Sequence, residues 1–390
     1  MFPTAPDPRC AVSVVVPVRD EAATLGDSLR ALAHQVDDRG RPLDAATYEV
    51  LVLANNCRDE SASLCRQVVR RHPWLRLHLA EVELPTAEAH VGGARRLVMD
   101  QAFYRLASRG RDRGVIASTD GDTRVAATWL AEIQAAVAAG ADAVAGRIFI
   151  DHEGLMGLPP GTRRSHLKSA GYEYLLAEYA ARTDPLPWDP WPGHHQHYGA
   201  SLAVTVAAYR RAGGVPDVPD LEDIALCRSL LRVDARVRHS PRVRAWTSGR
   251  LHGRASRGLS WQLREWTGMA GDGRGVVVEH PRTTGARVRL RRELRLCWLG
   301  RRVDVSPAPR QVATLADLVG REPAWLADRL ATAPTFGALY EGVEEAAIES
   351  GAAPPGPAVP IDEAIRELRS CCHRLRLRDT SACATLQTYL

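Results

Sequence analysis

The sequence predicts an α/β fold, with a three-layer, mainly parallel sheet and a helical C-terminal extension. Two apolar runs, residues 11–18 and 49–54, are rich in aliphatic side chains, which is typical of strands buried on both faces. A segment with the apolar spacing of a helix follows each run. Strands that alternate with helices at this spacing specify a mainly parallel sheet covered on both sides. Beyond about residue 280, the recognisable segments are helical.

The individual elements follow from local patterns of apolar, β-branched and turn-forming residues. Strands are expected at residues 11–18, 49–54, 75–83, 142–150 and 242–246, and a further strand begins at residue 115 and leads into Asp120-Gly121-Asp122. Helices are expected at about residues 21–35, 61–71, 91–107, 126–139, 165–182, 220–232, 311–319, 323–331, 336–349 and 361–375.

Composition excludes several classes of protein. The formal charge of +5 over 390 residues suits a partner that carries phosphate or carboxylate, and does not argue for nucleic acid. The eight cysteines include no C-x-x-C pair, so neither a zinc site nor a disulfide framework is indicated. The N-terminus lacks an apolar signal core, and no run approaches 18 apolar residues. We therefore expect a cytoplasmic protein without a transmembrane segment.

The chemistry is expected where the strand at residue 115 ends, in the sequence Asp120-Gly121-Asp122. Gly121 allows a sharp turn, and the two carboxylates repel each other unless a cation lies between them. Mg²⁺ or Mn²⁺, which prefer oxygen ligands, fit this pair. On its own the pattern is also that of an ordinary surface turn. The polar turns at 17–21 and 55–59 favour the metal site, because the ends of parallel strands meet in one crevice.

A second acidic pair, Glu222-Asp223, opens a predicted helix after the turn Ala212-Gly213-Gly214. Acidic residues in a first helical turn are commonly caps or partners of the helix dipole. Because this pair follows the Asp-Gly-Asp motif by about a hundred residues and comes after a Gly-Gly turn, it also fits a catalytic role.

In this order and spacing, the motifs resemble the inverting, family 2 type of nucleotide-sugar glycosyltransferases, which have the GT-A fold. The resemblance covers roughly residues 12–266. It is carried by the turns after the first two strands, a Gly-Ala-Arg-Arg segment, the Asp-Gly-Asp motif in place of the family's D-x-D, a Gly-Ala-Ser sequence that leads to the Gly-Gly turn, and the Glu-Asp pair in place of the family's E-D. These segments are Pro17-Val18-Arg19-Asp20-Glu21, Asn55-Asn56-Cys57-Arg58-Asp59, Gly93-Ala94-Arg95-Arg96, Asp120-Gly121-Asp122, Gly199-Ala200-Ser201 with Ala212-Gly213-Gly214, and Glu222-Asp223.

The resemblance implies a role for each motif residue. Asp120 would face the ribose or the metal, and Asp122 would hold the divalent ion on the diphosphate. Asp223 would be the general base, supported by Glu222. The residues that would contact the nucleotide sugar are Pro17, Arg19, Glu21, Asn55, Asp59, Arg95, Asp120 and Gly121. Here Asn55-Asn56-Cys57 stands where the family often has Asp-Asp-Gly-Ser, so Asn55 would not contact the base through a charge.

A polar, basic turn follows the strand at residues 242–246. Because the resemblance includes a late histidine and a basic loop on the diphosphate, His252 is the candidate third metal ligand, and Arg250 and Arg254 are candidate phosphate contacts. A histidine in an arginine-rich turn also fits simple solvated surface.

Three regions are expected: residues 1–125 bind the nucleotide sugar, residues 126–280 form the acceptor-binding and catalytic-base half of the same domain, and residues 281–390 are helical. The predicted reaction moves a sugar from a UDP- or GDP-type donor to the hydroxyl of a small or lipid-linked acceptor, with inversion. Two alternatives stay open: a retaining enzyme similar to glucosyl-3-phosphoglycerate synthases, and a non-catalytic nucleotide-sugar-binding scaffold. The C-terminal region would cover the acceptor side or support a homodimer.

Overall fold

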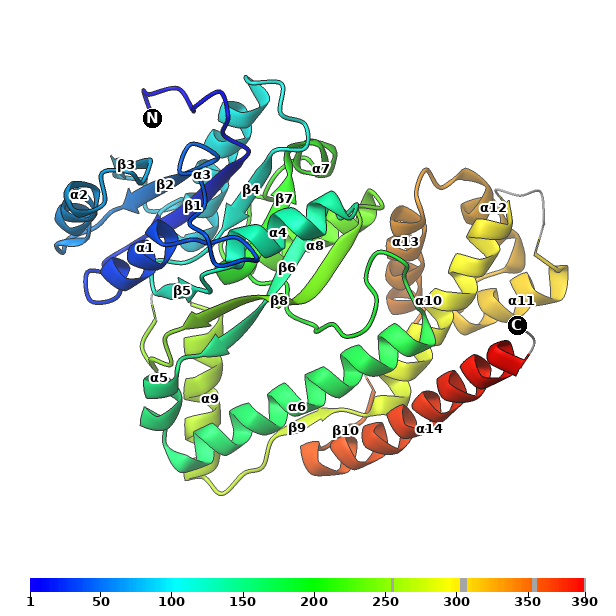
Figure 1. Ribbon diagram of the computed structural model, residues 1–390. Coiled ribbons are helices and arrows are strands. Elements are labelled where there is room, and N and C mark those ends of the chain that lie inside the picture. The colour runs from blue at the N-terminus through cyan, green and yellow to red at the C-terminus, as the bar shows by residue number, and fades with distance from the viewer. Residues whose placement is uncertain (254–255, 302–306, 353–355, 389–390) are drawn as a thin grey trace. The chain divides into compact units, whose positions relative to one another are not determined.

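An eight-stranded sheet organises the first of two units of the chain (Figure 1). The computed structural model describes residues 1–253, 256–301, 307–352 and 356–388. The first unit comprises Met1–Arg163, Gln196–Leu230 and Ala235–Thr267. The second comprises Arg164–His195, Leu231–Asp234 and Gly268–Leu390. The three-region division predicted from the sequence remains a prediction.

The strand order in the sheet is β3-β2-β1-β4-β7-β6-β8-β5. Pairing is parallel between β1 and β2, β2 and β3, β1 and β4, and β6 and β8, whereas β7 is antiparallel to both of its neighbours and β5 is antiparallel to β8. The predicted fold class is thus confirmed, with a sheet that is mixed although most of its pairings are parallel. The strands are β1 (Val12–Val18), β2 (Tyr48–Asn55), β3 (Leu77–Val82), β4 (Val115–Ser118), β5 (Thr123–Val125), β6 (Ala143–Ile150), β7 (Leu202–Thr205) and β8 (Val237–Thr247).

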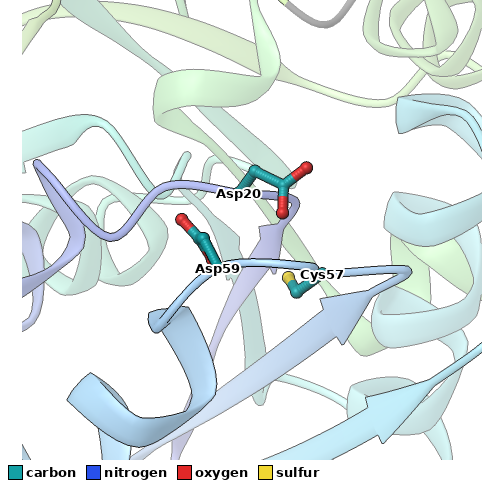
Figure 2. A group of neighbouring side chains, drawn as sticks. All are labelled: Asp20, Cys57 and Asp59. Carbon is teal, nitrogen blue, oxygen red and sulfur yellow. The ribbon is translucent and has the colours of Figure 1, made fainter.

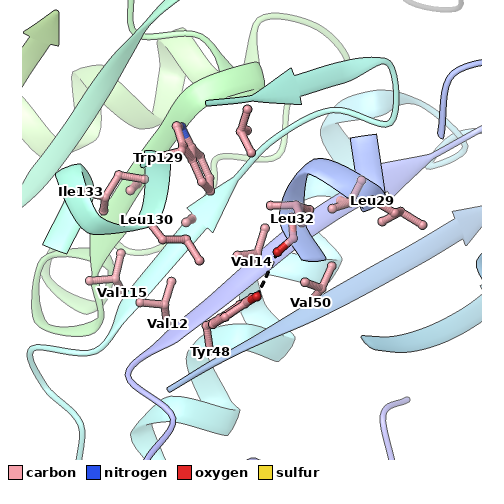
Figure 3. Close-up of a cluster of buried hydrophobic side chains, with 14 of the residues drawn as sticks. Val12, Val14, Leu29, Leu32, Tyr48, Val50, Val115, Trp129, Leu130 and Ile133 are labelled. Atoms are coloured by element: carbon pink, nitrogen blue, oxygen red, sulfur yellow. Dashed lines mark hydrogen bonds between the residues drawn. The ribbon is translucent and has the colours of Figure 1, made fainter. Parts of the chain in front are cut away.

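Helices cover both faces of this sheet. Alternate residues of β1, beginning with Val12 and Val14, pack against Leu29 and Leu32 of α1 and join Trp129 of α4 in one buried cluster (Figure 3). On the opposite face lies α3. The helices of this unit include α1 (Leu25–Ala33), α2 (Ser61–Arg71), α3 (Val91–Ala107), α4 (Trp129–Ala138), α5 (His152–Gly157), α7 (Val206–Ala212), α8 (Glu222–Arg232) and α9 (Leu259–Gly271), the last of which continues into the second unit.

A buried polar cluster attaches α3 to the sheet. Arg105 donates to both carboxylate oxygens of Glu49, at 3.0 and 2.6 Å, and Ser13 Oγ donates to Glu49 Oε1 at 2.7 Å. All three side chains are buried, so each needs a polar partner. The cluster fixes α3 over β1 and β2, and with it the position of Arg95 on the same helix.

The second unit is mainly helical, as predicted. Buried side chains of α10, α11, α12 and α13 form one apolar cluster, and Tyr172 of α6 packs with Ile361 and Leu368 of α14 in another. The unit also contains a short antiparallel pair, β9 and β10. Its elements are α6 (Pro160–Thr183, which begins in the first unit), β9 (Val277–Glu279), α10 (Pro281–Arg301), α11 (Pro309–Leu318), α12 (Pro323–Thr332), α13 (Phe336–Glu349), β10 (Ala358–Pro360) and α14 (Ile361–Thr388).

Within the described ranges, none of the helices is both long and apolar enough to span a membrane.

Strand register brings the functional motifs to one edge of the sheet. Val12 of β1 pairs with both Tyr48 and Val115, so β1, β2 and β4 run together and their carboxyl ends lie at the same edge. Ser118 pairs with Leu202 at the start of the antiparallel β7, which brings the 3-10 turn Gly199–Ser201 to that edge too. The crevice predicted from the polar turns therefore has a structural basis.

Candidate active site

The Asp-Gly-Asp turn joins β4 to β5 at this edge. Gly121 is packed closely: a Cβ added there would lie 3.2 Å from Glu21 Cγ and 3.3 Å from Val18 Cγ2. Its carbonyl oxygen accepts a hydrogen bond from Ser28 Oγ at 3.0 Å. The small residue lets the turn lie against the end of β1, so Asp120 and Asp122 are held at fixed positions on either side of it.

Arg95 of α3 neutralises the first carboxylate of the turn. Its guanidinium donates to Asp120 Oδ1 at 2.7 Å and to Glu222 Oε1 at 2.7 Å. It also donates to Ser118 Oγ at 2.5 Å and to the Gly199 carbonyl oxygen at 3.3 Å. Only 4% of the Arg95 side chain is exposed, against 34% of the Asp120 side chain. Arg95 therefore lies beneath the crevice and joins its two acidic motifs.

Arg95 stays protonated although it is buried. Burial disfavours the charged guanidinium, but the negative charges of Asp120 and Glu222 outweigh that cost and raise the pKa of Arg95 above its ordinary value. A buried cation with two carboxylate partners and two further oxygen acceptors has nearly all of its hydrogen-bonding capacity used.

Asp223 lies at the start of α8, next to Glu222. Its Oδ2 accepts from the backbone N–H of Gly199 at 2.7 Å, and its Oδ1 accepts from that of Ile224 at 2.8 Å. Glu222 is buried and bonded to Arg95, whereas Asp223 is partly exposed. The two adjacent carboxylates thus differ in solvent accessibility: Asp223 is partly accessible and Glu222 is buried.

A second arginine neutralises the other carboxylate of the turn. Arg250, just beyond the end of β8, donates to both oxygens of Glu21 at 2.6 Å and lies 3.0 Å from Asp122 Oδ2. Thr247 Oγ1 also donates to Asp122 Oδ1, at 3.3 Å. Burial, the charge of Asp120 and the charge of Glu21 raise the pKa of Asp122 to about 6, although Arg250 acts in the opposite direction. Asp122, whose side chain is 13% exposed, is thus a largely buried carboxylate near two other carboxylates.

The ends of β1 and β2 form a further group of polar turns. Asp20 Oδ1 accepts from the Arg58 N–H at 2.6 Å, and Asp59 accepts from the N–H groups of Ala22 and Ser61 at 2.9 and 3.0 Å. Figure 2 shows Asp20, Cys57 and Asp59 facing one another across these turns, with their candidate ligand atoms within 4.8 Å. These hydrogen bonds from backbone N–H groups to Asp20 and Asp59 hold the turn after β1 against the turn after β2, and we call this pair of turns the brace.

A pocket of about 350 Å³ opens beside this brace, between the ends of β1, β2 and the loop after β3. The Asn56 side chain is bonded to the backbone of Leu84 through both its amide nitrogen and its oxygen, at 3.1 and 3.0 Å, which fixes one wall. Arg19 donates to the Ala89 carbonyl oxygen at 2.5 Å and fixes another. The lining residues are Arg19, Asn56, Cys57, Arg58, Glu83, Leu84, Thr86 and Ala89.

Asn55, the last residue of β2, carries an unusual acceptor. The residue is 2% exposed, and in the described part of the chain its Oδ1 atom has no hydrogen-bond partner. A buried acceptor that lacks a donor costs about 1–3 kcal/mol. Asn55 is not among the residues that line the pocket, although the next residue, Asn56, is.

The late histidine and the second arginine of the basic turn stay predictions. His252 is exposed, and the described ranges hold no group of three candidate ligands that combines it with Asp120 and Asp122. Arg254 lies outside the described residues. Pro17, by contrast, is within β1 at the same edge as Glu21 and Asp120.

Several residues of this region were not singled out from the sequence. Thr247 contacts Asp122 because β5 pairs with β8, and β5 is only three residues long, too short for a recognisable pattern. The pocket residues Glu83 and Thr86 follow β3 in a loop without a motif. Gly199, in contrast, belongs to a Gly-Ala-Ser sequence that the family resemblance already contained.

Comparison with known protein families points to one family for the first part of the chain. Residues 13–188 match the family model described as glycosyl transferase family 2. The matched segment contains the turns after β1, β2 and β4, and with them the Asp-Gly-Asp motif, whereas Thr247 and Arg250, which contact Asp122, lie beyond it. The match indicates a glycosyl transferase domain of this family over residues 13–188. A comparison with curated proteins found no relative.

Solved structures offer distant likenesses. Staphylococcus aureus TarS 1–349 in complex with UDP has 14% sequence identity and a TM-score of 0.42, over 91% of each chain. The mannosyltransferase PcManGT from Pyrobaculum calidifontis, in complex with GDP-Man and Mn²⁺, has 18% identity and a TM-score of 0.39, over 100% of this chain and 88% of that one. Glucosyl-3-phosphoglycerate synthase from Mycobacterium tuberculosis has 16% identity and a TM-score of 0.37, over 69% and 84%.

Proposed function

We propose that the chain transfers a sugar from a nucleotide-diphosphate sugar to an acceptor hydroxyl with inversion, and that the reaction depends on a divalent ion. The observation that carries this proposal is the convergence of acidic residues on one edge of the sheet. Arg95 links Asp120 to Glu222, the neighbour of Asp223. Arg250 links Glu21 to Asp122. A set of acids at the carboxyl edge of an α/β sheet suits a phosphate-bearing donor held through a cation.

The acidic residues fit a hard divalent ion. Asp122 and Glu21 supply carboxylate oxygens, which Mg²⁺ and Mn²⁺ prefer, and burial of Asp122 among other carboxylates favours a neutralising cation. Asp122, with Asp120 beside it, would hold the ion. When bound, it would neutralise the charge that develops on the leaving diphosphate.

Asp223 is proposed as the general base. It takes the proton from the acceptor hydroxyl, whose oxygen then forms a bond to the anomeric carbon as the bond to the diphosphate breaks on the opposite face. Its partial exposure and its fixed orientation on Gly199 suit this role, whereas the bonds of buried Glu222 to Arg95 suit a supporting one. Arg95 is proposed to position both Asp120 and Glu222.

The pocket of about 350 Å³ beside Arg19 is proposed to receive the nucleoside. Asn55 Oδ1 would then accept a hydrogen bond from an N–H group of the base, which accounts for a buried acceptor without a donor in the described protein. Of the residues that the family resemblance implies around the nucleoside, Arg19 lines this pocket, and Pro17 and Asp59 stay predicted contacts. Uracil and guanine both carry a ring N–H, so either base meets this requirement.

A calorimetric titration tests the proposal. UDP, GDP and their common sugar conjugates are titrated into the purified protein with Mn²⁺ and then with a chelator. Binding of one diphosphate that is lost on chelation supports the donor site and identifies the base. Absence of binding by every nucleotide, with and without Mn²⁺, would contradict the proposal.

The stereochemistry of the product separates inversion from retention. With a base on the face opposite the leaving group, the anomeric configuration of the donor should be reversed in the product. Retained configuration, read from the anomeric coupling constant by NMR, would assign the chain to the retaining alternative. Nucleotide binding without transfer over a broad panel of acceptors would favour the scaffold alternative.

A further inference from the structure

Arg250 occupies the position that a cation would take in the proposed donor site. Its guanidinium forms a bidentate contact with Glu21, at 2.6 Å to each oxygen, and reaches Asp122 at 3.0 Å. Asp122 belongs to the Asp-Gly-Asp turn, and Glu21 packs against Gly121 of that turn. A bidentate guanidinium–carboxylate pair is among the stronger charge-assisted contacts in proteins, and here the Glu21 side chain is only 10% exposed.

The turn that carries Arg250 is anchored on both sides. Gly249 lies directly on α5: a Cβ added to Gly249 would lie 2.7 Å from the Gly154 carbonyl carbon and 2.8 Å from Ile150 Cγ2. On the other side, Arg264 of α9 donates to the Leu251 carbonyl oxygen at 2.7 Å. Because the backbone is fixed before and after it, Arg250 reaches the two carboxylates from a defined position.

We propose that Arg250 is the resident cation of the donor site, and that it makes divalent-ion binding conditional on the presence of the donor diphosphate. This inference rests on the proposed function. An ion that binds Asp122 alone must displace the 3.0 Å contact between Arg250 and Asp122, and it places a second positive charge next to a guanidinium that stays bonded to Glu21. A bound diphosphate supplies anionic oxygens between the two cations, so the guanidinium exchanges its contact with Asp122 for a phosphate partner when both ligands arrive.

This arrangement differs from a simple phosphate contact. A residue that only binds phosphate would not affect ion affinity in the absence of nucleotide. A resident cation opposes the ion when nucleotide is absent and ceases to oppose it when the diphosphate is bound. The same side chain therefore enforces joint binding of ion and donor, and keeps the carboxylates neutralised between reaction cycles.

The test is the affinity of the protein for Mn²⁺ alone, measured from the electron paramagnetic resonance signal of free Mn²⁺. Arg250→Gln should bind Mn²⁺ at least about tenfold more tightly than the wild type without nucleotide, since charge-assisted hydrogen bonds no longer compete. Adding UDP or GDP should increase the affinity of the wild type more than that of the variant. Arg244→Gln is the matched control: it removes the same charge from an exposed position on β8 and should behave as the wild type.

Equal Mn²⁺ affinity of Arg250→Gln and the wild type without nucleotide would overturn the inference. If Arg250→Gln does not fold, Arg250→Lys decides, because an ammonium cannot form the bidentate contact and should give a smaller gain of the same sign. If Arg250→Lys shows no gain in Mn²⁺ affinity without nucleotide, that result would also overturn the inference. A gain in Mn²⁺ affinity together with no nucleotide binding by any variant would support the resident cation and contradict the proposed donor.

Discussion

The two ends of the Asp-Gly-Asp turn carry the same chemical pair in different surroundings. Asp120 is paired with Arg95, whose side chain is 4% exposed and which also bonds Glu222, Ser118 and Gly199. Asp122 is paired with Arg250, whose side chain is 28% exposed and which also contacts Glu21. Breaking the pair of Arg95 and Asp120 leaves charged groups inside the protein without a partner. The pair of Arg250 and Asp122 is accessible to solvent and to ligands.

This difference separates a structural arginine from an exchangeable one. A buried ion pair is costly to break because the partner left behind has lost its solvation, although the intact pair itself contributes little net stability. A partly exposed pair is more screened, so a ligand competes with it at moderate cost. We expect substitutions on the Arg95 side to change folding and those on the Arg250 side to change ligand binding.

The largest effect is expected for Arg95→Gln. It leaves Glu222 buried without its cation and removes the partner of Asp120, which should lower the free energy of unfolding by about 3–5 kcal/mol. Urea unfolding followed by circular dichroism measures this loss. The matched control is Arg96→Gln at the next position, where the arginine and its partner Asp217 are 43% and 75% exposed and the loss should stay below about 1 kcal/mol. Equal losses in the two variants would remove the distinction drawn for Arg95.

Asp223→Asn should act on turnover. The amide keeps the oxygen that accepts from Gly199 but cannot take a proton, so the transfer rate should fall by roughly 10²-fold or more, with nucleotide affinity unchanged. Single-turnover kinetics with the donor identified by calorimetry measures the rate. Asp220→Asn, three residues earlier and bonded to Ser256, is the control and should retain the wild-type rate. Unchanged transfer in Asp223→Asn would exclude it as the base.

Asp122→Asn should make nucleotide binding independent of the divalent ion. A neutral amide is a poor ligand for a hard cation, so Mn²⁺ should no longer increase UDP or GDP affinity, and the affinity should equal that of the wild type with chelator. Because Arg250 keeps its bidentate contact with Glu21, the variant should remain folded. The measurement is the ratio of nucleotide affinities with and without Mn²⁺, which should fall to about one. A ratio as large as that of the wild type would show that Asp122 does not hold the ion.

Much of the fold could be predicted because its signals are local. The helices Ser61–Arg71 and Val91–Ala107 begin and end where the apolar spacing predicts, and β1 and β2 are within one residue of the expected strands. Antiparallel elements escaped prediction: β5 is three residues long and β7 four, so neither shows a period. Helix α10 was not among the helices expected from the sequence.

The site was predictable as a list of residues but not as a network. The sequence motifs include Asp120, Asp122, Glu222 and Asp223, since each follows a recognisable strand or turn. Their arginine partners depend on contacts over long sequence separations: Arg95 meets Glu222 across 127 residues, and Arg250 meets Glu21 across 229. Burial distinguishes the two arginines, and it depends on how α3 and β8 pack, which no local pattern encodes.

The smallest effect is expected for Gly249→Ala, which tests the pair of Arg250 and Asp122 without changing any charge. In Gly249→Ala, the new Cβ would meet Gly154 and Ile150 at less than 3 Å, so the turn that carries Arg250 must shift, at a cost of about 1–3 kcal/mol in unfolding free energy. The shift should weaken the Arg250 contact and raise Mn²⁺ affinity without nucleotide, by less than in Arg250→Gln. Gly268→Ala, in α9 with open space around it, should instead gain up to about 1 kcal/mol and leave Mn²⁺ affinity unchanged. A stability loss in Gly249→Ala with Mn²⁺ affinity unaltered would mean that the position of the turn does not control the exchangeable pair.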